Sequence, residues 1–169
     1  SYATGFLASN YISSIDLCSL HKGILQRVPL SKAAFKVIVQ APVIEELLFR
    51  GLIQQCLLKP VVNGCSRVMC SAHDKLFGVT PTAEVIANRK SVEKIARIAM
   101  TSLLFGAVHM NNYRLGYASK SYAIMQSIGA AILGYQFGKI AESRLGVAGS
   151  IGFHLAHNAI VFAGSYLTC

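Results

Sequence analysis

The sequence predicts an all-α protein, a polytopic integral-membrane helical bundle of about four or five transmembrane helices with a polar site in the bundle interior. Of its 169 residues, 53% are hydrophobic and 14% are charged, whereas soluble domains average about 25% charged residues. The mean hydropathy is +0.49. Long apolar runs alternate with short polar stretches, and a few ionisable residues stand inside those runs. Such residues are costly in a bilayer and face a protein interior, so they indicate a functional site.

The length of the chain corresponds to one domain, residues 1–169, and its formal net charge is +9. A positive charge of this size raises the question of nucleic-acid binding. The basic residues, however, fall mostly between the apolar runs, where anionic lipid headgroups explain them better. No basic patch interleaved with aromatic residues is present. We expect the lipid bilayer as a partner and no nucleic acid, and the oligomeric state is not predicted.

The N-terminal third is organised around one long apolar run. Residues 1–20 are mildly apolar and serine-rich, and they fit either a marginal membrane helix or an interfacial one. Residues 21–36 are basic and predict a loop that leads into a helix. Residues 33–58 follow as a run long enough to cross a bilayer at 1.5 Å per residue. Lys59-Pro60 is expected to end this helix.

Residues 61–93 are the most polar part of the chain and predict an extramembrane loop insert, with a short helix near residues 82–88. Asp74 and Glu84 in this insert are expected to be solvated loop carboxylates. The insert is placed to shape access to a site or to bind a partner.

Three more apolar runs predict the remaining spans, at residues 95–110, 122–140 and 147–167, with a polar hinge at 111–121 and a charged turn at 139–146. Glycines at a spacing that allows close helix packing occur in the second of these runs, namely Gly129, Gly134 and Gly138.

The charged residues of the first long run form a compact group. Glu46 and Arg50 are four residues apart, acid before base, which favours an ion pair on one helix face. Glu45 lies about 100° around the helix and is left free to act as a base. Pro42 either starts a new helix or kinks a long one. The alternative is that Glu46–Arg50 is a structural ion pair and Glu45 a solvated surface residue.

Histidines are the other polar residues of note in the apolar runs. His109 lies four residues after Phe105, and His154 lies four residues before Asn158, so each pair shares a helix face. A single buried histidine is often structural, and we interpret His157 in that way. Histidines in two predicted spans and a glutamate pair in a third favour a site where helices converge.

Together these residues resemble a known family signature. The ordered motifs are Glu45-Glu46-x-x-x-Arg50, Phe105-x-x-x-His109 and His154-x-x-x-Asn158. They are similar to the three motifs of the CAAX protease and bacteriocin-processing family, also called CPBP or Abi, which comprises membrane-embedded glutamate proteases and includes the CAAX prenyl endopeptidases. Each motif alone is weak, but the ordered triple in apolar helices is specific. The resemblance covers residues 37–163.

The resemblance implies a hydrolase, a membrane-embedded endopeptidase that cuts near a membrane-proximal or C-terminal, CAAX-like segment of a peptide or prenylated-protein substrate. It also implies a water-activating pair, an oxyanion-binding pair and a supporting ion pair, formed respectively by Glu45 with His109, His154 with Asn158, and Glu46 with Arg50. Members of the family commonly have six or more membrane helices, which is consistent with a truncated N-terminus here. A bacterial inner (plasma) membrane is the expected location.

Alternatives to this reading remain open. A zinc metalloprotease would use Glu45, His109 and His154 as ligands, although the helix motif His-Glu-x-x-His is absent. We favour a reaction that requires no cofactor. A non-catalytic membrane peptide-binding or bacteriocin-immunity protein with the same fold is a second candidate. A transporter or channel is a third, against which stands the lack of an internal repeat.

Overall fold

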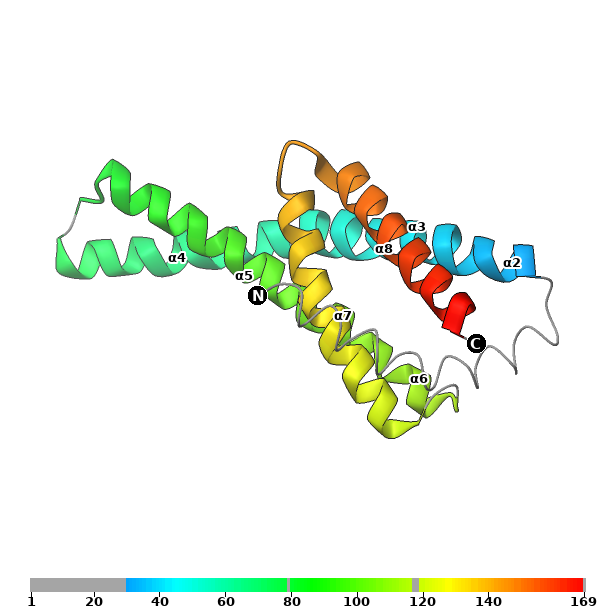
Figure 1. Ribbon diagram of the computed structural model, residues 1–169. Coiled ribbons are helices and arrows are strands. Elements are labelled where there is room, and N and C mark those ends of the chain that lie inside the picture. The colour runs from blue at the N-terminus through cyan, green and yellow to red at the C-terminus, as the bar shows by residue number, and fades with distance from the viewer. Residues whose placement is uncertain (1–29, 79, 117–118, 169) are drawn as a thin grey trace.

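A computed structural model describes residues 30–78, 80–116 and 119–168 of the chain, and every regular element in these ranges is a helix (Figure 1). The predicted all-α class is therefore confirmed for the described residues. The prediction for residues 1–20 and most of that for residues 21–36 concern a part of the chain outside these ranges.

The first long helix runs without a break from residue 30 to residue 77 and alternates between α-helical and π-helical segments. These segments are α2 (Leu30–Ala34), η1 (Phe35–Gln40, π), α3 (Ala41–Glu46), η2 (Leu47–Leu58, π) and α4 (Lys59–Phe77). The prediction that Lys59-Pro60 ends the helix is wrong. Pro60 lies at the junction of the π-helical η2 and α4, and the helix continues through it. The helix ends instead at Gly78, whose φ of 62° forms a left-handed cap.

The predicted loop at residues 61–93 is a helical hairpin. Its second arm begins α5 (Ala83–His109), which is capped by the Thr82 side chain accepting a hydrogen bond from the Val85 N–H. Asp74 is not a solvated loop carboxylate, because both its oxygens accept hydrogen bonds from Arg89 at 2.9 and 3.0 Å. The polar residues of this segment occupy the surfaces of two helices, and their density had suggested a loop.

Three further helices complete the fold: α6 (Asn111–Arg114), α7 (Lys120–Ala141) and α8 (Gly146–Thr168). The predicted apolar runs at residues 95–110, 122–140 and 147–167 thus lie in α5, α7 and α8. α5 packs most extensively against α7, and α8 lies against η1 and α3. In Figure 1 the hairpin of α4 and the first half of α5 extends away from α7 and α8.

Glycine allows α5 and α7 to pack closely. A Cβ atom on Gly138 would lie 2.9 Å from Ile98 of α5, and one on Gly134 would lie 3.1 Å from Phe105. These two glycines therefore have the predicted packing role, whereas Gly129 faces open space and does not. The tightest point is Gly106 on α5, where a Cβ atom would lie 2.6 Å from the backbone oxygen of Ser127.

We expect Gly106→Ala to destabilise the protein by about 1–3 kcal/mol, because backbone and not a flexible side chain blocks the added methyl group. Gly129→Ala is the matched control. It has room for the methyl group and should gain up to about 1 kcal/mol from helix propensity. Thermal unfolding in detergent, followed by circular dichroism, measures both variants. Equal effects of the two substitutions would contradict close packing at Gly106.

The interior is polar and the surface apolar, which is the reverse of a soluble domain. Among the described residues, the buried side chains comprise eight polar or charged ones and seven hydrophobic ones. Large apolar side chains such as Leu103 (67% exposed) and Ile132 (61% exposed) point outward. An exterior of this kind indicates a lipid environment. Within the described residues one helix, α8 over residues 146–164, is long and apolar enough to cross a membrane. The larger number of spans stays a prediction.

Candidate functional site

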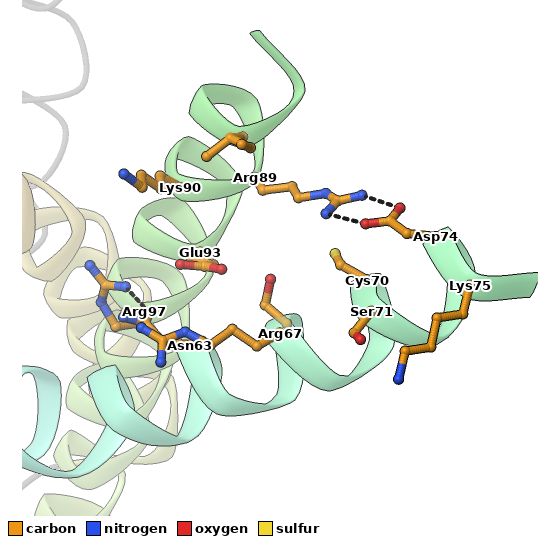
Figure 2. A pocket seen from close by; sticks show the side chains of 12 residues that line it. Asn63, Arg67, Cys70, Ser71, Asp74, Lys75, Arg89, Lys90, Glu93 and Arg97 are labelled. Carbon is orange, nitrogen blue, oxygen red and sulfur yellow. Dashed lines mark hydrogen bonds and ion pairs between the residues drawn. The ribbon is translucent and has the colours of Figure 1, made fainter. Parts of the chain in front are cut away.

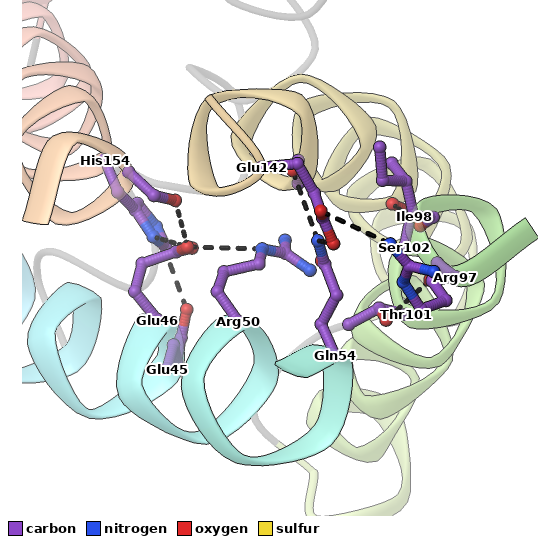
Figure 3. Close-up of polar contacts among 12 residues, drawn as sticks. Glu45, Glu46, Arg50, Gln54, Arg97, Ile98, Thr101, Ser102, Glu142 and His154 are labelled. Atoms are coloured by element: carbon purple, nitrogen blue, oxygen red, sulfur yellow. Dashed lines mark hydrogen bonds and ion pairs between the residues drawn. The ribbon is translucent and has the colours of Figure 1, made fainter. Parts of the chain in front are cut away.

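The centre of the polar interior is the predicted ion pair on the first long helix. Glu46 and Arg50 are both fully buried, and the Arg50 Nε–H donates to Glu46 Oε2 at 3.2 Å. The Ser150 hydroxyl on α8 donates to the same carboxylate oxygen. Glu46 therefore joins the first helix to α8, and its charge is balanced within the protein (Figure 3).

His154 on α8 contacts both glutamates. Its Nδ1 lies 3.0 Å from Glu46 Oε1, and its Nε2 lies 3.7 Å from Glu45 Oε2. Because an ionised carboxylate only accepts hydrogen bonds, Nδ1 carries the proton that Glu46 accepts. The Glu45 side chain is 32% exposed, whereas that of Glu46 is 0% exposed. The two neighbouring carboxylates thus differ, since one is enclosed and the other remains accessible beside a histidine.

His109, near the end of α5, has its orientation fixed by the backbone. Its Nδ1 lies 2.8 Å from the carbonyl oxygen of Phe105, which requires a proton on Nδ1. In the neutral ring Nε2 is then a hydrogen-bond acceptor. The Phe105 ring lies between the two histidines, 4.9 Å from the ring of His109 and 6.0 Å from that of His154. His109 is also close enough to interact electrostatically with Glu45.

The Phe105 ring also borders the arginine. The Arg50 guanidinium lies over it at 5.1 Å, and Phe49 packs edge-on against it at 5.0 Å. The two terminal guanidinium nitrogens of Arg50 are buried without a hydrogen-bond partner among the described residues. The aromatic face of Phe105 thus lies against the guanidinium and replaces part of its lost hydration.

Asn158 on α8 contacts the backbone of the first helix. Its Nδ2 donates to the carbonyl oxygen of Val37 at 2.9 Å. In the π-helical turn the Ala41 N–H donates to Lys36 O, five residues back. The same pattern would pair Val37 O with residue 42, and Pro42 has no N–H. Asn158 therefore supplies the hydrogen bond that Pro42 cannot make.

A second polar network, which the sequence analysis missed, adjoins the first. The Gln54 amide donates to Gly138 O and to Glu142 Oε1, both at 3.2 Å. Arg97 in turn contacts Glu142 at 3.4 Å and Asn63 at 2.9 Å. These contacts connect η2, α4, α5 and α7 beside the ion pair (Figure 3). Gln54 lies one turn beyond Arg50 on the same helix face, which was the available signal.

The structure brings together five of the six predicted site residues, and Asn158 lies one turn beyond His154 on the same face of α8. His157, interpreted as structural, is half-buried. Over the same residues no three His, Cys, Asp or Glu side chains are grouped to hold a metal ion. Zinc ligation by Glu45, His109 and His154 stays an alternative hypothesis.

Comparison with known proteins gives one match. A family model described as type II CAAX prenyl endopeptidase Rce1-like matches residues 29–160, which include all the polar residues of the site described above. No curated protein and no solved structure matches the chain.

Proposed function

Because the chain belongs to the Rce1-like family of type II CAAX prenyl endopeptidases, as its motifs predicted, we propose that it is a membrane-embedded endopeptidase in which Glu45 activates water. The observation that carries this proposal is that the accessible Glu45 carboxylate lies beside His154, next to the enclosed Glu46–Arg50 pair. The family supports a CAAX-type endopeptidase, and we propose for the individual residues the roles that the motif resemblance implies. The assignment to a bacterial inner membrane stays a prediction.

Glu45 and His109 would hold the attacking water between two hydrogen-bond acceptors. In its ionised form Glu45 would accept a hydrogen bond from one O–H of the water, and the Nε2 lone pair of His109 would accept one from the other O–H. As the water oxygen bonds to the peptide carbonyl carbon, its proton passes to Glu45 and the carbonyl electrons move to oxygen. When the C–N bond then breaks, Glu45 returns that proton to the leaving amine. The products are an amine and a carboxylic acid that keeps the second proton of the water until it ionises in solution, and Glu45 is regenerated.

His154 and Asn158 would stabilise the oxyanion formed in this step. With Nδ1 bound to Glu46, Nε2 of His154 is the nitrogen directed to the accessible side, and it donates when the ring carries both protons. Asn158 uses one amide hydrogen for Val37 O and has the second available. Donors that other hydrogen bonds of the protein already hold in place do not reorganise during the reaction, which is the main source of oxyanion stabilisation.

The experiment that tests the proposed function measures cleavage of quenched-fluorescence peptides by the purified chain in detergent. A farnesylated CAAX peptide is compared with the same peptide lacking the farnesyl group, each with and without a chelator. We expect turnover of the farnesylated peptide that persists with the chelator. Loss with chelator and recovery with zinc would replace the mechanism with a metalloprotease. Binding of the peptide without cleavage would favour the non-catalytic alternative.

Asn158 has two roles in this scheme, and a pair of variants separates them. Asn158→Ala leaves the Val37 carbonyl without a partner and should cost about 1 kcal/mol of stability as well as activity. Adding Pro42→Ala provides a backbone N–H for that carbonyl, so stability should recover in the double variant. Turnover should stay low if the amide also binds the oxyanion. Recovery of both properties would assign Asn158 a structural role alone.

A further inference from the structure

A cavity of about 660 Å³ lies between α4 and the first half of α5, away from the glutamate and histidine cluster. Figure 2 shows the Asp74–Arg89 ion pair at one end and the contact of Arg97 with Asn63 at the other. Its volume falls in the range of small-molecule sites, about 300–1,000 Å³. The cavity is therefore large enough for a ligand of several atoms.

The lining of this cavity has an excess of positive charge. Its basic residues are Arg67, Lys75, Arg89, Lys90 and Arg97, and its acidic residues are Asp74 and Glu93. The Arg89 hydrogen bonds hold the pKa of Asp74 below its usual value, so this carboxylate is ionised and already neutralised. Arg67, Lys75 and Lys90 make no ion pair or hydrogen bond with the described residues. Glu93 alone is left to oppose them.

Arg97 provides an independent indication of a ligand. Its side chain is 7% exposed, with one terminal nitrogen donating to Asn63 and the other contacting Glu142. Its Nε–H is buried without a partner among the residues described. A buried donor without an acceptor is costly and uncommon in a folded protein. Arg97 lines the cavity, so the residue that carries this unpaired donor is part of the cavity wall.

We propose that the cavity binds a phosphate-bearing anion through Arg67 and Lys90, with Arg97 in the cavity wall. Phosphate presents several acceptor oxygens to donors on different helices, and guanidinium groups match its geometry and charge. A phospholipid headgroup and a soluble phosphate share this chemistry. This anion site is separate from the proposed peptidase site, so anion binding does not depend on peptide cleavage.

The test uses the full chain in detergent and two probes. Isothermal titration calorimetry measures binding of inorganic phosphate, and native mass spectrometry compares bound phosphatidic acid with phosphatidylcholine. Arg67→Gln/Lys90→Gln removes two exposed cavity charges, one from each helix of the hairpin. Lys59→Gln/Lys94→Gln is the matched control, because it removes two exposed charges from the same helices outside the cavity.

We expect the cavity variant to bind at least one probe tenfold or more weakly than the unmodified chain, while the control variant binds normally. If the cavity variant loses binding of phosphatidic acid alone, the ligand is a lipid headgroup. If it also loses binding of inorganic phosphate, the ligand comes from a soluble source. Binding that falls equally in both variants would reflect net charge alone and overturn the proposal. Absence of binding of either probe to the unmodified chain would overturn it too.

Discussion

Glu45→Gln is expected to lower kcat/KM for a cleaved peptide by about 10³-fold, the contribution typical of a general base. Glutamine keeps the shape of the side chain and its acceptor oxygen but does not take up the proton of the attacking water. Because Glu45 is partly exposed and makes no contact with Arg50 shorter than 4.0 Å, the fold should be preserved. Cleavage kinetics and peptide affinity are measured on the same preparation, so that a loss of catalysis can be distinguished from a loss of peptide binding.

Glu84→Gln is the control for this experiment, since Glu84 is an exposed carboxylate in the first turn of α5. It should leave both kinetics and binding unchanged. The Glu45 variant should also bind the uncleaved peptide as tightly as the unmodified chain. Retention of a tenth or more of the activity in the Glu45 variant would remove this residue from the role of general base.

The sequence located much of the site because helical spacing makes widely separated residues recognisable as pairs. Glu46 and Arg50 were predicted to be paired, and they are. Glu45 was predicted to be free of the arginine, and its neighbour is His154 from a helix more than a hundred residues later. No spacing rule gives that contact, because it depends on how α8 packs against α3.

The uncharged polar residues of the site could not be distinguished in the sequence. Ser150 lies one turn before His154, and Gln54 one turn after Arg50, so each extends a face already recognised. Serine and threonine in an apolar helix often bond only to their own backbone, as Ser102 does to Ile98 O. Nothing in one sequence distinguishes such a residue from Ser150, whose hydroxyl bonds to another helix.

The main error in the fold concerned Pro60 and the residues that follow it. A proline after a lysine was read as the end of a helix, and the charges beyond it as a loop. In the structure the proline falls in the first turn of α4, and Asp74 and Arg89 pair across two helices. The same charges that suggested a loop therefore line a cavity between helices.

Arg50→Met is expected to destabilise the protein by about 3–5 kcal/mol, because it leaves the fully buried Glu46 without its cationic partner. The Ser150 and His154 hydrogen bonds remain but do not replace the lost charge. Unfolding in mixed detergent micelles, followed by circular dichroism, measures the loss. Arg144→Met is the control, since Arg144 is exposed in the turn before α8 and should change stability by less than about 0.5 kcal/mol.

The double variant Glu46→Gln/Arg50→Met decides whether charge or packing causes the effect. Removing both charges leaves a neutral amide whose oxygen accepts from His154 Nδ1 and whose NH2 group donates to the Ser150 hydroxyl, so most of the stability should return. If the double variant is as unstable as Arg50→Met, the loss comes from packing of the arginine against Phe105 and Gly134. Recovery of stability together with reduced turnover would show that the pair is not needed for the fold. The role of the ion pair would then be to position His154, which Glu46 holds beside Glu45.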